Sequence, residues 1–76
     1  MTDTDASQQP SRFAGMTVNE RLFVAGLFKA WQAAVRARNR TKMLDLLSQV
    51  SDAELTRDVA IKCVDTMLAD PAKYGY

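Results

Sequence analysis

Histidine is absent from the 76-residue sequence, and cysteine occurs once, as Cys63. Histidine is the commonest protein ligand of transition metals and the usual general base. Its absence therefore excludes histidine-based catalytic triads and zinc fingers with histidine ligands. A single cysteine cannot form an internal disulfide and fits a reducing compartment. We expect no metal site and no cofactor. Cys63 falls on the apolar side of a predicted helix, so it should be a buried thiol with a raised pKa.

Long apolar runs and targeting signals are also lacking. No apolar stretch approaches the roughly 18 residues of a membrane-spanning helix. The N-terminal segment starts with acids and contains no apolar h-region, which argues against a secretory signal and favours a cytoplasmic protein. Residues 1–15 are rich in Thr, Asp, Ser and Gln, and bury too little to offset their ordering entropy. We expect a flexible tail over 1–15 and a single helical domain over 16–76.

The sequence motifs of catalysis are missing as well. There is no glycine-rich phosphate loop, no EF-hand loop and no nucleophile elbow. Asp52 and Glu54 suit the first turn of a helix, and Asp58 stands four residues before Lys62, the spacing of an ion pair on one helix face. The carboxylates thus have ordinary structural uses, and we predict that the chain is not an enzyme.

Acidic residues are absent from one long stretch of the chain. Residues 21–42 carry six cations and no acid, although the formal net charge is only +1. The cations are Arg21, Lys29, Arg36, Arg38, Arg40 and Lys42. Residues 43–76 carry three cations against six acids. The chain therefore has a basic front and an acidic back.

What the sequence does contain is helical periodicity. The segment TVNE predicts a capping box between Thr17 and Glu20 at the start of a first helix, near 17–38. Gly26, in the middle of that helix, suggests a close contact with another helix because glycine is otherwise costly there. A short second helix follows near 41–50, capped by Thr41 or Asn39.

A third helix is expected near 52–69. The segment SDAE predicts a second capping box, between Ser51 and Glu54. Pro71 disfavours helical geometry at Asp70, so the helix should stop near Ala69. Tyr74 or Tyr76 could then turn back to cover an exposed end of the core. The fold class is all-α, as a three-helix bundle in the order long, short, long.

The apolar arcs of the two long helices are wider than a stripe that faces one core. Three helices of one chain could cover these arcs between them. However, a second helix of about nine residues is only about 14 Å long, against about 30 Å for a helix of 20 residues. This leaves apolar surface near one end, so we favour a homodimer over a monomer.

A small, non-enzymatic protein–protein interaction module is the leading functional hypothesis, as an adaptor, inhibitor or regulator that self-associates. Its predicted contact residues are Val24, Phe28 and Trp31 for the apolar part, and Arg36, Arg38 and Arg40 at the basic end. At its helical spacing Trp31 is also an ordinary core residue. The turn RARNR and the ending DPAKYGY have the style of a small bacterial protein.

Nucleic-acid binding by the basic face of the first helix is the alternative hypothesis. Against it, the same cations could form a solvated face or pair with the acidic third helix, and no surface aromatic residues alternate with them. Membrane binding is less economical, because it would take Phe23, Leu27, Trp31 and Val35 away from the core.

Overall fold

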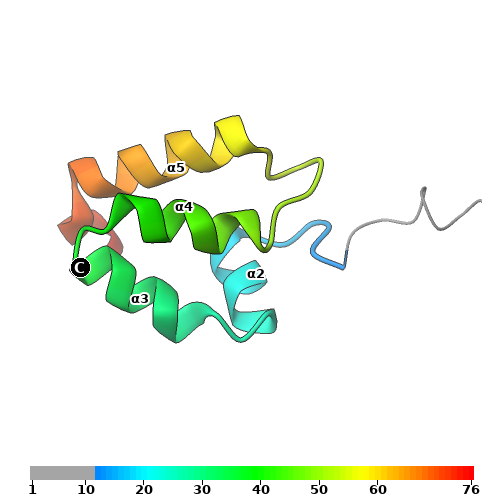
Figure 1. Ribbon diagram of the computed structural model, residues 1–76, viewed down its shortest axis with the longest axis horizontal. Coiled ribbons are helices and arrows are strands. Elements are labelled where there is room, and N and C mark those ends of the chain that lie inside the picture. The colour runs from blue at the N-terminus through cyan, green and yellow to red at the C-terminus, as the bar shows by residue number, and fades with distance from the viewer. Residues whose placement is uncertain (1–11) are drawn as a thin grey trace, which may run out of the picture.

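Four α-helices and a C-terminal 3-10 helix form the computed structural model, which describes residues 12–76. The helices are α2 (Val18–Val24), α3 (Phe28–Arg36), α4 (Arg40–Ser48) and α5 (Arg57–Ala69), followed by η1 (Pro71–Tyr74). The helix α4 packs between α3 and α5, while α2 packs on both α3 and α4 (Figure 1). The all-α prediction is confirmed for these residues. Their helices number four, however, and not the three that the sequence predicted.

The capping box at the start of α2 is present as predicted. The Thr17 hydroxyl accepts a hydrogen bond from the Glu20 amide at 3.2 Å, and the Glu20 carboxylate accepts one from the Thr17 amide at 2.8 Å. Two of the amides that an isolated helix start leaves unpaired are therefore satisfied by residues three apart.

Gly26 divides the predicted first helix in two. Its φ is +76°, a left-handed conformation that glycine adopts without steric cost. The Leu27 amide donates to the Leu22 carbonyl at 2.8 Å and the Gly26 amide to the Phe23 carbonyl at 3.1 Å, the two bonds of a Schellman motif. A Cβ on Gly26 would meet no atom beyond its chain neighbours within 4 Å. The prediction of a close helix–helix contact is therefore wrong, and backbone geometry is what requires the glycine.

The helix α3 ends with the same motif but without a glycine. Arg38 has a φ of +55°, and the Asn39 amide donates to the Ala34 carbonyl at 2.9 Å. Asn39 then caps α4, because its side-chain oxygen accepts from the Lys42 amide at 3.1 Å. The second predicted helix thus has one of its two proposed caps.

The second predicted capping box is wrong. The helix α5 begins at Arg57, where the Thr56 hydroxyl accepts from the Val59 amide at 3.4 Å. Upstream, one Asp52 oxygen accepts from the Glu54 amide at 2.9 Å and from the Leu55 amide at 3.0 Å, which forms a turn in place of a helix start. The predicted end at Ala69, before Pro71, is confirmed.

The core draws on every α-helix and on the turn before α2. Residues 12–15, which the sequence assigned to the tail, form a turn, and Phe13 is 7% exposed. The guanidinium groups of Arg12 and Arg21 lie 4.7 and 6.0 Å from the Phe13 ring centroid, so this side chain has a packed environment. Residues 1–11 of the predicted tail lie outside the described residues. The helices within 12–76 are all too short or too polar to cross a membrane.

Candidate binding surface

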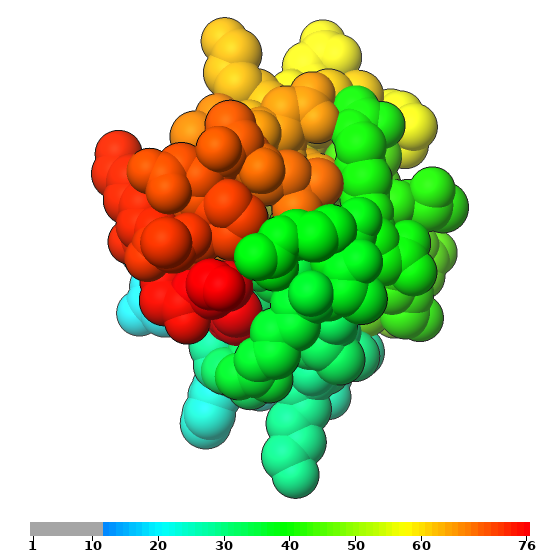
Figure 2. Space-filling view, turned by 90° about the vertical axis from the view of Figure 1, so that its left-hand side faces the viewer, coloured from blue at the N-terminus to red at the C-terminus, as the bar shows by residue number. Residues whose placement is uncertain are grey.

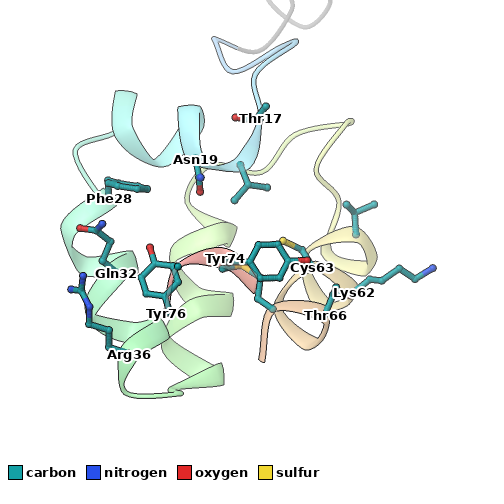
Figure 3. Close-up of a pocket in the computed structure, with 14 residues that line it drawn as sticks. Thr17, Asn19, Phe28, Gln32, Arg36, Lys62, Cys63, Thr66, Tyr74 and Tyr76 are labelled. Carbon is teal, nitrogen blue, oxygen red and sulfur yellow. The ribbon is translucent and has the colours of Figure 1, made fainter. Parts of the chain in front are cut away.

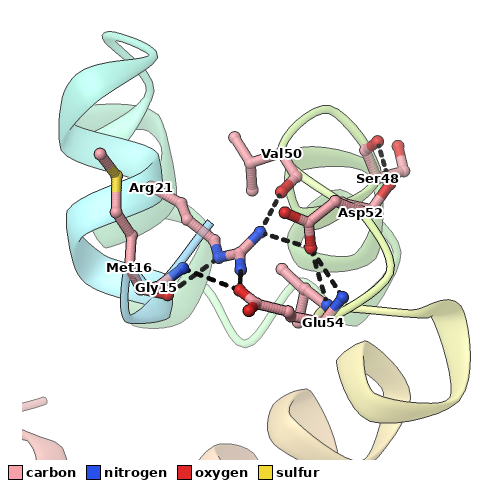
Figure 4. Close-up of polar contacts among 9 residues, drawn as sticks. Gly15, Met16, Arg21, Ser48, Val50, Asp52 and Glu54 are labelled. Carbon is pink, nitrogen blue, oxygen red and sulfur yellow. Dashed lines mark hydrogen bonds and ion pairs between the residues drawn. The ribbon is translucent and has the colours of Figure 1, made fainter. Parts of the chain in front are cut away.

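Arg21, the first cation of the basic stretch, is buried and does not belong to the surface. It is 2% exposed and lies between the start of α2 and the loop before α5 (Figure 4). Its guanidinium forms ion pairs with Asp52 at 2.9 Å and Glu54 at 3.1 Å. It also donates to the carbonyls of Met16 and Val50, each at 3.0 Å. Arg21 therefore holds two distant segments together.

Helical spacing could have placed Arg21 on the inner face. It stands three residues after Val18 and four before Ala25, and both of these pack against the core. Residues at these spacings share one side of a helix. The charge pattern of the sequence did not reveal the burial of Arg21, because Arg21 was grouped with the other cations of residues 21–42.

Arg40 is on the surface but is already paired. Its guanidinium contacts Asp65 of α5 at 2.8 Å, and a second nitrogen donates to the other carboxylate oxygen at 3.4 Å. The hydrogen bond lowers the pKa of Asp65 below its ordinary value and raises the pKa of Arg40. The pairing of the basic stretch with the acidic third helix, which the sequence offered as an alternative, occurs here within one chain.

Arg38 and Arg36 contact different groups of the same chain. The Arg38 guanidinium donates to the carbonyls of Val35 at 2.7 Å and Arg36 at 3.3 Å, so it folds back over the end of α3. The Arg36 guanidinium lies 5.6 Å from the ring centroid of Tyr76, within cation–π range. Of the three arginines predicted as contacts, Arg36 lines the groove described below.

The three predicted apolar contacts lie in three different environments. Trp31 has no exposed surface, and its Nε1 has no hydrogen-bond partner among residues 12–76. It belongs to the core and presents nothing to a partner in this structure. Val24 is 50% exposed on α2, beside Phe23, which is 73% exposed. Phe28 is half-buried at the start of α3.

A groove of about 810 Å³ separates α2 and α3 from α5 and η1. One wall follows α3 through Phe28, Gln32 and Arg36, and the other follows α5 (Figure 3). The C-terminal residues close one end, between α5 and the junction of α3 with α4 (Figure 2). The lining residues are Thr17, Val18, Asn19, Phe28, Gln32, Arg36, Val59, Lys62, Cys63, Thr66, Met67, Tyr74, Gly75 and Tyr76.

The charged side chains of this lining carry one sign. Its ionised side chains are Arg36 on α3 and Lys62 on α5, and no aspartate or glutamate is among the lining residues. Cys63 is half-buried there, and burial raises the pKa of its thiol as the sequence predicted. With a thiol that ionises less readily than usual, the groove presents apolar and cationic surface.

A smaller hollow of about 420 Å³ continues from the groove over α2. It is lined by Met16, Asn19, Glu20, Phe23, Val24 and Phe28. Asn19 and Phe28 line both depressions, so the two adjoin. Val24 and Phe28, predicted as contacts, thus meet on one face of the molecule, and Arg36 lies further along it.

Sequence reasoning did not place Phe23, Val59 or Lys62 on the candidate binding surface. Phe23 was assigned to a core stripe of one long helix, but the turn at Gly26 ends that stripe and leaves the ring exposed. Val59 and Lys62 come from a helix some 30 residues further along the chain, and no local pattern joins them to Phe28. Tyr76 packs on the core as predicted, while Tyr74 is 40% exposed.

Residues 12–76 contain no cluster of three or more metal-ligating side chains. Comparison with models of known families, with curated proteins and with solved structures gives no match to this chain.

Proposed function

We propose that this chain is a small, non-enzymatic protein–protein interaction module that self-associates through the outer face of α2. The observation that carries the proposal is the adjoining pair of depressions, with Phe23 73% exposed and Val24 50% exposed at their edge. Scattered apolar side chains are common on protein surfaces, but here they gather around a concave site. Contiguous exposed apolar patches, unlike scattered apolar residues, mark interaction sites.

The face has the shape that a two-fold dimer uses. In such a dimer the same patch occurs on both subunits, so a protruding group must fit a recess on the same patch. Phe23 is 73% exposed and lines the hollow together with Met16, Val24 and Phe28. The Phe23 ring of one copy can therefore enter the hollow of the other, and the reverse contact forms at the same time.

Sedimentation velocity tests this proposal by comparing Phe23→Asp with Ala33→Asp. Both substitutions add one carboxylate to an exposed helical position, but Ala33 lines neither depression. We expect wild type and Ala33→Asp to dimerise at micromolar concentration, and Phe23→Asp to stay monomeric with an unchanged helical circular dichroism spectrum. A wild-type chain that remains monomeric would remove self-association from the proposal.

The paired arginines support a protein partner over a nucleic acid. Of the six cations between Arg21 and Lys42, Arg21 is buried, Arg40 pairs with Asp65, and Lys42 lies 4.0 Å from Asp45. Fewer free cations remain to neutralise phosphates and release counterions. We expect no mobility shift with duplex DNA or RNA at low salt; a shift that disappears with added salt would favour nucleic acid.

The cytoplasmic location stays a prediction.

A further inference from the structure

We propose that the groove between α3 and α5 binds an acidic, amphipathic helix of another protein, whose apolar side chains fill the groove and whose carboxylates contact Arg36 and Lys62. The inference rests on the proposed interaction function and specifies the partner's chemistry. It concerns the groove alone, whereas self-association concerns the outer face of α2.

Charge selects the occupant. Arg36 and Lys62 stand on opposite walls, and the other lining side chains are neutral. A basic segment would bring like charges close to both cations, while an acidic segment forms a pair with each. Neither Arg36 nor Lys62 has an ion-pair partner among residues 12–76. Electrostatic complementarity of this kind discriminates between partners and speeds their encounter.

The apolar lining selects an amphipathic segment over a uniformly charged one. Phe28 and Met67 pack against the core and line the groove from opposite sides, and Val59 is 47% exposed at its edge. Covering these side chains removes apolar surface from water, which is the main favourable term in most protein association. The occupant therefore needs apolar groups on the side that faces the groove.

The walls select a helix as the form of that segment. One way in which extended peptides gain affinity is by adding a strand to the edge of a sheet, and residues 12–76 contain no strand. A groove between two helices instead accepts an amphipathic helix with apolar anchors three and four residues apart. The α3 wall runs from Phe28 to Arg36, about 12 Å at the rise of an α-helix, which corresponds to roughly two turns of the partner.

Selection from a random library of 16-residue displayed peptides tests the proposal, because it requires no named partner. The bait is the full chain carrying Phe23→Asp, so that self-association does not occupy the neighbouring face. We expect enriched peptides to combine aspartate or glutamate with apolar residues at helical spacing. Enrichment of basic peptides, or of none, would overturn the proposal.

A matched pair of variants locates the binding site. Arg36→Glu/Lys62→Glu should weaken binding of a selected synthetic peptide by about tenfold or more. Lys29→Glu/Arg57→Glu makes the same change in net charge at exposed positions outside the groove and should leave the affinity within about twofold. Equal affinity for the two double variants would place the peptide elsewhere and contradict the inference.

Cys63 provides a readout that is independent of the mutations. Because it lines the groove, bound peptide should slow its alkylation by iodoacetamide at pH 8.5 at least about tenfold at saturation. An unchanged alkylation rate would overturn the assignment.

Two further outcomes would overturn the inference in favour of a different occupant. One is competition of a 16-nucleotide single strand with the peptide, lost in Arg36→Glu/Lys62→Glu, which would assign the groove to nucleic acid. The other is loss of self-association in Arg36→Glu/Lys62→Glu when Phe23 is unchanged, which would assign the groove to a second copy of this chain.

Peptide binding by a wild-type chain that stays monomeric would leave the groove inference standing and remove the self-association proposal alone.

Discussion

Arg21 and Arg40 make the same kind of ion pair in opposite surroundings. Each guanidinium approaches a carboxylate from a distant part of the chain, at 2.9 Å for Arg21–Asp52 and 2.8 Å for Arg40–Asp65. The exposed fraction of the arginine side chain is 3% in the first pair and 49% in the second. Distance alone would rank the two pairs as equals, while burial makes them different in kind.

Burial changes what is lost when a partner is removed. Water can replace a partner at the exposed pair, so such pairs contribute little to stability. At the buried site Arg21 also satisfies the Met16 and Val50 carbonyls, which water does not reach as easily once the side chain is gone. The buried pair therefore joins two segments of the fold, whereas the residues of the exposed pair can be substituted with little loss of stability. The predictions that follow test this difference, beginning with the largest effect.

Arg21→Met should destabilise the fold most. It keeps much of the side-chain volume but removes the cation that pairs with Asp52 and Glu54 and the donor to two carbonyls, at a cost of about 3–5 kcal/mol. This is comparable to the whole stability of a small domain without a disulfide. We expect the variant to be largely unfolded at 25 °C by circular dichroism, while Arg40→Met stays folded. Equal urea midpoints for the two variants would show that burial does not distinguish the pairs.

Asp52→Asn should have an intermediate effect. The amide oxygen still accepts from the amides of Glu54 and Leu55, but Arg21 loses its better-buried counter-charge, at a cost of about 1–3 kcal/mol. Glu54→Gln is the matched control, because the Glu54 side chain is 57% exposed. Its cost should be clearly smaller in urea denaturation. The reverse order would mean that Glu54 is the principal partner of Arg21.

Arg40→Met, Asp65→Asn and the corresponding double variant should all denature close to wild type. Whatever coupling the cycle reveals between the two side chains should disappear in 1 M salt, where the Debye length is about 3 Å. The Arg21–Asp52 cycle should keep its coupling at the same salt. Salt sensitivity of both cycles would contradict the assignment of one pair to the interior.

The smallest predicted effect is the pH dependence of the Arg40–Asp65 pair. The hydrogen bond from Arg40 lowers the pKa of Asp65 below its ordinary value of 3.8, so the folded chain binds this proton more weakly than the unfolded chain. The contribution of the pair is present above that value and is lost as the pH falls below it. The stability difference between wild type and Asp65→Asn should therefore be constant above pH 3.8 and shrink below it. A difference that grows on acidification would contradict the sign.

Local interactions were predictable from the sequence, and long-range ones were not. The Thr17–Glu20 capping box needs only residues three apart, and it forms as predicted. Ser51 and Glu54 have the same spacing, but the Glu54 carboxylate contacts Arg21 and the Gly15 amide. The Glu54 carboxylate, which the local pattern had assigned to a helix cap, thus binds partners 33 and 39 residues away in the sequence.

The candidate surface shows the same limit. Val24, Phe28 and Arg36 were predicted as contact residues because residues 21–42 combine apolar and cationic side chains at helical spacing. Trp31 was placed on both lists and belongs to the core. The opposite wall required knowing that α5 lies across from α3, which depends on the packing of both against α4.

The turn at Gly26 lets the chain fold back after α2, so that Arg21 pairs with Asp52 of the same molecule. Alanine there would raise the cost of the left-handed turn by about 1 kcal/mol. A straight helix over residues 18–36 would then compete, and it would carry α2 away from its own loop. Arg21 could still reach Asp52, but on a second copy, which is how a domain-swapped dimer forms at a hinge. We expect Gly26→Ala to populate such a dimer by light scattering, even when it also carries Phe23→Asp. We therefore expect the glycine at this turn to favour closure of the buried ion pair within one molecule over closure between two.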